Sequence, residues 1–117
     1  MNKSEKKCFS LIQQLVTTRN PLCQMCGDVP VSAHHVFGRR NHRSSFNPDS
    51  CLSLCVNCHQ IAHTTPQEAH DLLHTIIGGD KYAHLSFLSQ QVTRLRDKDY
   101  LDISIELGQK LISMKSV

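Results

Sequence analysis

Residues 23–27 read CQMCG and residues 55–59 read CVNCH, so two Cys-x-x-Cys pairs stand on either side of residues 28–54. Each pair suits a tight turn that points two thiolates at one ion, and four thiolates complete a closed tetrahedral shell around zinc. Such a site is structural rather than catalytic, and it stabilises the fold by on the order of 10 kcal/mol. A redox pair or two disulfides are the rival interpretations. The predicted ligands of a structural zinc are Cys23, Cys26, Cys55 and Cys58.

The composition fits a small domain that depends on such a metal site. The chain has 117 residues, of which 39% are hydrophobic and 5% aromatic, and it contains no Trp. This length predicts one domain, residues 1–117, and a core this small usually needs a metal or disulfides. Charged residues make up 20% of the chain and the net charge is +3, which excludes disorder on composition. No apolar window is long enough to span a membrane, and no signal peptide can be read at residues 1–7. We therefore expect a cytoplasmic protein, in a compartment where Cys pairs more often bind metal than form disulfides.

Hydrophobic periodicity predicts helices on both sides of the cysteine region. Over residues 3–18 the apolar positions share one helical face, and an Asn-Pro pair ends the helix. A second helix over residues 65–77 begins with the capping-box pattern TPQE and ends at a Gly-Gly pair. A third helix starts at Asp80 and a fourth near Asp97 or Asp99. The residues that these last two helices are expected to bury are Leu85, Leu88, Val92, Leu95, Ile103, Leu107, Leu111 and Met114.

The region between the first two helices predicts short strands and a short helix. Residues 29–36 and 51–54 are typical of strands, and residues 57–63 of a helix. The predicted fold class is a small α+β protein. A metal-bound ββα centre, held together by the four-cysteine zinc over residues 22–63, follows the N-terminal helix and precedes a C-terminal helical hairpin or bundle over residues 65–115. The two remaining cysteines, predicted to be small buried hydrophobes, are Cys8 and Cys51.

Four histidines of the same region predict a second metal site. His59 and His63 are four residues apart, so on a helix they share a face and can bind one ion together. His34 and His35 are adjacent, so on a strand they point to opposite sides of the sheet. His34 then completes a three-nitrogen site with open positions, as catalytic metals are held, while His35 can act on a water beside the metal. The alternative is a Cys/His zinc module whose spare histidines lie at the surface.

The charge placement predicts a polyanionic substrate. Residues 29–48 contain no carboxylate, but Arg39, Arg40 and Arg43 lie there, with His42 among them. Arg guanidinium groups match the geometry of phosphate oxygens. A solvated charged loop is the alternative interpretation.

The segments CQMCG, SAHHVFGRR and FNPDSCLSLCVNCHQIAH together resemble the HNH, or ββα-metal, endonucleases, most closely the small phage and prophage members. The resemblance covers roughly a third of the chain, and its motif is specific in combination. It implies that His35 is the general base. It also implies that Ser50 replaces an Asn that braces the loop carrying this base, with a shorter reach. The implied ligands of a catalytic divalent metal (Mg²⁺, Mn²⁺, Ni²⁺ or Zn²⁺) are His34, His59 and His63.

The function that this resemblance implies is metal-dependent hydrolysis of phosphodiester bonds in DNA, with Arg39, Arg40 and Arg43 on flanking phosphates. No membrane partner is expected. One alternative is a non-catalytic zinc module that binds nucleic acid or protein. Another is an inhibitor or adaptor whose working surface is the helices of residues 65–115; an exposed apolar stripe on those helices would favour it.

Overall fold

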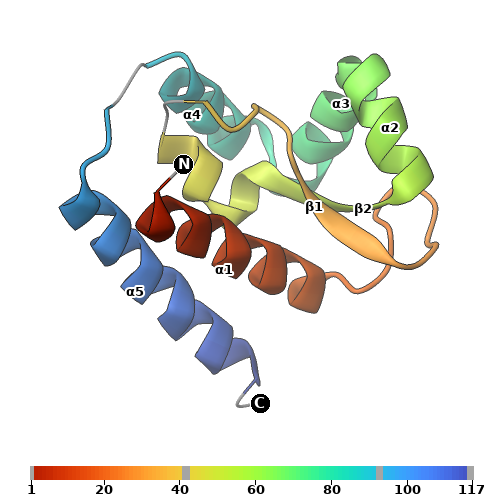
Figure 1. Ribbon diagram of the computed structural model, residues 1–117. Coiled ribbons are helices and arrows are strands. Elements are labelled where there is room, and N and C mark those ends of the chain that lie inside the picture. The colour runs from red at the N-terminus through yellow and green to blue at the C-terminus, as the bar shows by residue number, and fades with distance from the viewer. Residues whose placement is uncertain (1, 41–42, 92–93, 116–117) are drawn as a thin grey trace.

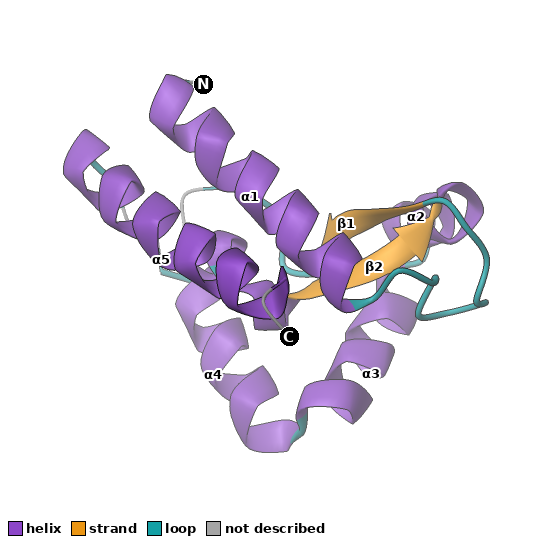
Figure 2. Cartoon of the chain, turned by 90° about the horizontal axis from the view of Figure 1, so that it is seen from below, coloured by secondary structure: helices purple, strands orange, loops and turns teal. Residues whose placement is uncertain are grey.

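The computed structural model describes residues 2–40, 43–91 and 94–115. In this part the chain forms five α-helices, one two-stranded sheet and two short 3-10 helices (Figures 1 and 2). The α+β class is thereby confirmed. None of the described helices is long and apolar enough to cross a membrane. The elements in chain order are α1 (Lys3–Arg19), β1 (Val31–His35), η1 (Arg43–Phe46), η2 (Pro48–Ser50), β2 (Cys51–Cys55), α2 (Val56–Thr64), α3 (Pro66–Ile77), α4 (Gly79–Ser89) and α5 (Asp97–Lys115).

Helix α1 follows its predicted apolar face and ends one residue later than expected. Its first turn is capped by Asn2, whose side-chain oxygen accepts a hydrogen bond from the backbone N–H of Glu5 at 2.8 Å. The buried face points at the sheet and at α5, and it includes Cys8, which confirms that residue as a small buried hydrophobe. Cys51, at the start of β2, is also buried, as predicted. The buried residues of α1 are Cys8, Ile12, Leu15 and Val16.

The two strands pair antiparallel, with His34 opposite Leu52 and His35 opposite Cys51. Strand β1 begins two residues later than predicted and ends one residue earlier, whereas β2 extends by one residue to Cys55 and runs directly into α2. Because successive side chains alternate between faces, each strand contributes to two clusters of core residues. Ala33 and Cys51 pack toward α1 and α5, while Leu52 and Leu54 pack toward α2 and α3.

The connection between the strands contains two short 3-10 helices that hydrophobic periodicity did not predict. Helices η1 and η2 bury three serines and a phenylalanine although the segment has no regular apolar spacing. The backbone N–H groups of Asn47 and Ser50 donate to the carbonyls of Ser44 and Asn47 at 3.1 and 3.0 Å, so the loop satisfies its own polar groups. His42 lies outside the described residues.

The sequence predicted a C-terminal helical hairpin or bundle, and the described helices form a hairpin rather than a bundle. Helices α3 and α4 meet as a hairpin, but α5 lies alongside α1 (Figure 2). The two helices begin at the same end of the molecule, where the Asn2 side chain donates to Asp97 at 3.3 Å and the Tyr100 hydroxyl donates to Glu5 at 2.9 Å. Leu107 and Leu111 of α5 are buried in the same core cluster as the apolar face of α1, so α5 covers part of that face.

Two further details of the C-terminal half differ from expectation. The Thr65 side chain makes no capping hydrogen bond, because Thr65 still belongs to the end of α2: its backbone N–H donates to the carbonyl of Ile61 at 2.6 Å. Helix α4 ends at Ser89, so Leu95 lies beyond it, partly buried against the α1–α5 cluster. Val92 lies outside the described residues.

Candidate metal centres

Four cysteine sulfurs from two distant segments meet at one point, and we call them the four-cysteine cluster. The Sγ atoms of the predicted ligands all lie within 4.8 Å of one another, and those of Cys26 and Cys55 are 3.6 Å apart. A tetrahedral zinc with Zn–S bonds of about 2.3 Å requires sulfur–sulfur distances of about 3.8 Å. All six cysteines of the chain are described, and none forms a disulfide. The four-cysteine cluster can therefore hold a structural metal such as zinc.

The first Cys pair is fixed to the sheet by the residue between its cysteines. The backbone N–H of Gln24 donates to the carbonyl of Ser53 at 2.9 Å, and the Ser53 N–H donates to the Gln24 side-chain oxygen at 2.8 Å. The turn closes at Gly27, whose φ of +82° lies in the left-handed region. The second pair is fixed by α2 itself, since the Cys58 N–H donates to the sulfur of Cys55 at 3.5 Å. Gln24 was not singled out in the sequence, because nothing distinguishes it from a solvated side chain.

The electrostatics of the cluster favour a bound cation. Burial opposes ionisation of Cys23, but nearby backbone N–H groups, that of Cys55 first, outweigh burial and lower the pKa of Cys23 to about 6. Burial raises the pKa of the Cys58 thiol, with the other cysteines of the cluster adding to the effect. A divalent cation bound between these sulfurs would displace the protons that remain on the thiols.

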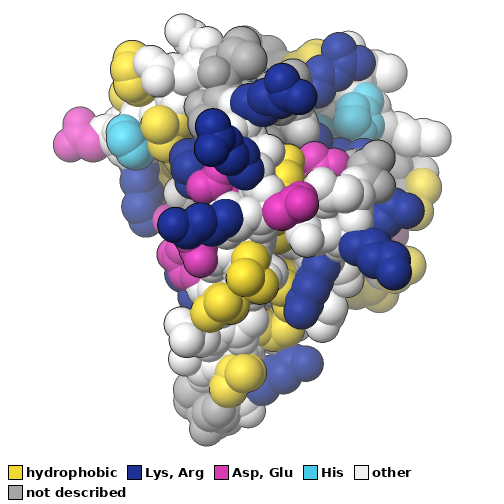
Figure 3. Space-filling model, turned by 60° about the vertical axis from the view of Figure 1, so that its left-hand side comes forward, with side chains coloured by type: hydrophobic (Ala, Val, Ile, Leu, Met, Phe, Trp, Pro, Cys, Tyr) yellow, Lys and Arg dark blue, Asp and Glu magenta, His cyan; other side chains and the backbone are white. Residues whose placement is uncertain are grey.

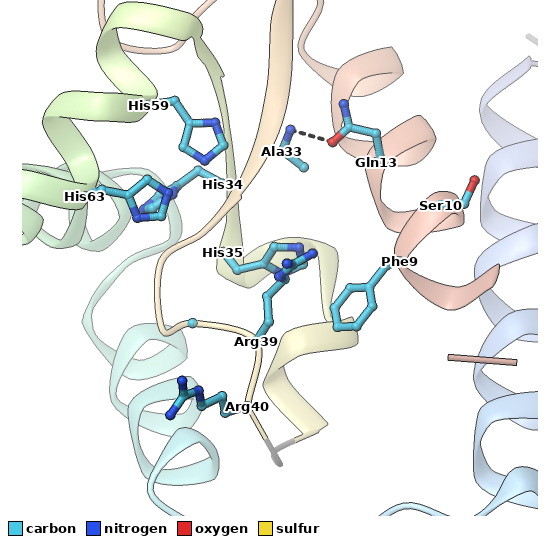
Figure 4. Close-up of a pocket in the computed structure, with 11 residues that line it drawn as sticks. Phe9, Ser10, Gln13, Ala33, His34, His35, Arg39, Arg40, His59 and His63 are labelled. Carbon is cyan, nitrogen blue, oxygen red and sulfur yellow. Dashed lines mark hydrogen bonds between the residues drawn. The ribbon is translucent and has the colours of Figure 1, made fainter. Parts of the chain in front are cut away.

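Three histidine rings form a second cluster, next to the sheet on the side facing α2 (Figure 4). One nitrogen from each of His34, His59 and His63 can be chosen so that all three lie within 4.8 Å of one another. The ring of His34 meets those of His59 and His63 edge-on, with centroids 5.0 and 5.1 Å away, while the rings of His59 and His63 are stacked at 5.0 Å. The spacing of four residues on α2, and the position of His34 on the side of β1 that faces α2, bring these three rings together.

The cluster is poised to bind a cation through neutral imidazoles. His34 is buried, and this burial, followed by the neighbouring histidines His59 and His63, lowers its pKa to about 4. Burial also lowers the pKa of His59. Nδ1 of His59 lies 2.8 Å from the hydroxyl of Ser32, so a proton on Nδ1 can be donated to that hydroxyl and Nε2 keeps its lone pair. Ser32 was missed in the sequence, where a serine on a strand carries no sign of this role.

His35 lies on the other face of β1, apart from the three-nitrogen cluster. Its Nδ1 atom is 3.5 Å from the sulfur of Cys51, and its ring meets the Phe9 ring edge-on at 5.5 Å. The Arg39 guanidinium lies over the same Phe9 ring, 5.0 Å from its centroid. The separation of His34 from His35 follows from the pleat of the strand.

The three-histidine cluster and His35 line one cleft of about 780 Å³ between α1, the sheet and α2 (Figure 4). The wall on the α1 side carries Phe9 and Gln13, and the Gln13 side chain accepts a hydrogen bond from the Ala33 N–H at 2.8 Å. Exposed Arg39 and Arg40 line the same cleft. Arg43 does not: its guanidinium lies 3.5 Å from the carboxylate of Asp99 on α5, and it lines a different cavity. The site residues that the structure brings together in the cleft are His34, His35, Arg39, Arg40, His59 and His63.

Ser50 lies behind the cleft rather than in its lining, fully buried at the end of η2. Its hydroxyl is within reach of two carbonyl acceptors, those of Ser44 at 2.5 Å and Asn47 at 2.8 Å. The backbone hydrogen bonds expected of Ser50 are present, because η1 and η2 bring these carbonyls to its hydroxyl. Asn47 has a separate role, since its side-chain oxygen accepts from the Asp49 N–H at 3.0 Å.

Arg19 holds the same loop from the opposite side. Its guanidinium donates to the carbonyls of Pro48 and Cys51, both at 3.0 Å, at the junction between η2 and β2. In the sequence Arg19 is an ordinary basic residue in the last turn of a helix, so this contact between residues far apart could not be foreseen. Together Ser50 and Arg19 fix the point at which the loop enters β2.

No protein-family model matches this chain, and no curated protein or solved structure shows significant similarity to it. The residues and geometry of the two clusters and the cleft are therefore the indications of function that this chain offers.

Proposed function

We propose that this protein is a metal-dependent endonuclease of the HNH, or ββα-metal, type that hydrolyses phosphodiester bonds in DNA. The observation that carries the proposal is the shared cleft. A three-nitrogen cluster suited to a cation, and a fourth histidine outside that cluster, both face a cavity with two arginines in its wall. A purely structural zinc module would need only the four-cysteine cluster.

The two clusters suit different tasks. The four-cysteine cluster closes its own shell, as in structural zinc sites, whereas the histidine cluster offers three ligands and leaves positions open. Imidazole nitrogens suit Zn²⁺ and Ni²⁺ best, and Mn²⁺ or Mg²⁺ are the other candidates. A divalent cation bound there would neutralise charge that develops on the scissile phosphate and the leaving oxygen.

The remaining chemistry belongs to the chain itself. In this mechanism His35 takes the proton from the attacking water through Nε2, which requires a neutral ring with its other nitrogen protonated. Arg39 and Arg40 hold the phosphates on either side of the scissile bond through charge-assisted hydrogen bonds. Such contacts position the backbone and carry little sequence information, so the protein should bind DNA of many sequences.

The test is cleavage of supercoiled plasmid by zinc-loaded protein with Mg²⁺, Mn²⁺, Ni²⁺ or added Zn²⁺, against the same reactions with chelator. Nicked or linear product that depends on the metal supports the proposal. DNA binding without product under any of the four metals would instead identify a non-catalytic zinc module.

The cleft arginines provide a separate prediction about binding. We expect the double substitution Arg39→Ala and Arg40→Ala to weaken DNA binding for all sequences and to lower the slope of log K against log salt by about 0.9 per lost phosphate contact. The matched control is Arg94→Ala with Arg96→Ala, which removes the same charge from exposed residues that do not line the cleft. Binding titrations over a salt series measure both slopes. Equal slopes for the two double variants would mean that the cleft does not face phosphate.

A second candidate function, an adaptor that works through the C-terminal helices, is favoured by one observation. Leu101, Ile105 and Ile112 on α5 are 57%, 51% and 66% exposed. Figure 3, which brings the α5 side of the molecule forward, shows separate hydrophobic patches among Lys and Arg side chains rather than one continuous apolar surface. An adaptor that works through α5 would leave the histidine cluster without a role, so the nuclease is the better-supported proposal.

A further inference from the structure

The side chain of Cys51 is buried against the imidazole of the proposed general base. Its sulfur lies 3.5 Å from Nδ1 of His35, and only 1% of Cys51 is exposed. The register of the sheet places the two residues directly opposite each other on neighbouring strands, so their side chains share a face. The contact is thus built into the strand pairing, and it does not depend on the conformation of a surface loop.

The surroundings of the sulfur offer its hydrogen an acceptor other than His35. Burial raises the pKa of Cys51 to about 12, so the group remains a thiol and its hydrogen needs an acceptor. The carbonyl of Asn47 lies 3.9 Å from the sulfur, within reach of an S–H donor. When the thiol hydrogen points to Asn47, a sulfur lone pair faces His35 and can accept a hydrogen bond from Nδ1–H.

The position of the sulfur is held by the backbone on either side of it. The Arg19 guanidinium donates to the carbonyl of Cys51 at 3.0 Å, and the preceding Ser50 is buried with its hydroxyl bonded to the loop. On the far side, the edge-on contact with Phe9 at 5.5 Å restricts the plane of the imidazole. A ring held in its plane by Phe9 and at one nitrogen by sulfur has a defined orientation.

We propose that Cys51 is a positioning residue for His35: it accepts a hydrogen bond from Nδ1–H and thereby keeps Nε2 unprotonated and directed into the cleft. The proposal rests on the proposed role of His35 as base. The tautomer that it assigns to His35 can nevertheless be measured without DNA cleavage. A neutral imidazole carries its proton on one of the two ring nitrogens. A hydrogen-bond acceptor beside Nδ1 favours the tautomer in which Nδ1 carries the proton.

The decisive measurement is the tautomer of His35, read from its ring nitrogens by long-range nitrogen–proton NMR in zinc-loaded protein, above the titration range of the imidazole. His35→Gln identifies the resonances by their loss. We expect Nδ1–H in the native protein and in Cys51→Ser, whose hydroxyl can also accept, and a shift toward Nε2–H in Cys51→Ala. Cys51→Val, which fills the space without a lone pair, is the second test and should shift in the same way. The matched control is Cys8→Ala, which removes another fully buried thiol that contacts α5 and not His35.

The kinetic counterpart is a selective loss of turnover. Misorientation of a catalytic group by about 1 Å can cost roughly a hundredfold in rate. We therefore expect Cys51→Ala and Cys51→Val to lower kcat about tenfold to a hundredfold with KM and zinc content unchanged, and Cys51→Ser to restore most of it. An unchanged tautomer in both Cys51→Ala and Cys51→Val overturns the proposal, whether or not the protein cleaves DNA. A shifted tautomer in a protein without nuclease activity upholds the contact and rejects only the proposed function.

Discussion

Replacing His35 by Ala is expected to lower the rate of DNA cleavage by a factor of about 10²–10⁴, the usual contribution of a general base. The ring lies on the opposite face of β1 from His34, so its loss leaves the three-nitrogen cluster intact. Because His35 is proposed to accept a proton rather than to hold the substrate, the affinity for DNA should change little. Single-turnover cleavage of a labelled duplex, together with a binding titration, separates the two effects.

The control for this variant is His84→Ala, which removes an exposed imidazole from α4, outside the cleft lining. Its cleavage rate should equal that of the native protein. If His35→Ala cleaves DNA at the native rate, another group takes the proton and the assignment of His35 as general base is wrong. If the variant loses cleavage and also loses the metal bound at the three-histidine cluster, then His35 contributes to metal binding rather than to proton transfer.

The second large effect is expected for Cys55→Ser, which should abolish zinc binding and the cooperative fold together. Cys55 is buried in the core cluster under α2 and α3, and its sulfur both neighbours Cys26 and accepts from the first turn of α2. A structural zinc supplies on the order of 10 kcal/mol, comparable with the entire stability of a small domain. Zinc content by elemental analysis and a thermal melt followed by circular dichroism measure the two losses.

Cys8→Ser provides the matched comparison, since it makes the same chemical change at a cysteine that is fully buried but belongs to neither metal cluster. This variant should lose some stability and keep its zinc. A folded Cys55→Ser protein with a sharp melting transition and no zinc would contradict the structural role assigned to the four-cysteine cluster.

Parts of both candidate metal clusters could be predicted from the sequence, because the spacing within each Cys pair and between His59 and His63 is local. Two cysteines separated by two residues, and two histidines four apart on a helix, meet on one face whatever the rest of the chain does. The pleat of β1 likewise decides that His34 and His35 separate. The sequence does not predict which distant segments of the chain contact one another, since that depends on packing across the whole molecule.

The features that could not be predicted share this long-range character. Nothing in the sequence indicates that Asp99 pairs with Arg43, that the Ser32 hydroxyl meets His59, or that α5 leaves the other C-terminal helices to lie along α1. The partners of Ser50 could not be predicted for a related reason. The sequence indicated that its hydroxyl could bond backbone, but the two 3-10 helices that bring the carbonyls of Ser44 and Asn47 to it leave no periodic signal.

The pairing of α1 with α5 has a consequence for the order of events during synthesis. Residues 20–96 separate the two helices, so at about 5–20 residues per second α1 waits on the order of ten seconds for its partner to be translated. Meanwhile residues 23–63, which carry the candidate ligands of both clusters, have already been synthesised. A nascent chain could therefore bind metal at these clusters before α5 is in place. Phe9 and Gln13 of α1 form one wall of the cleft, and α1 reaches its full packing only once α5 has emerged, so the cleft is completed after the two clusters.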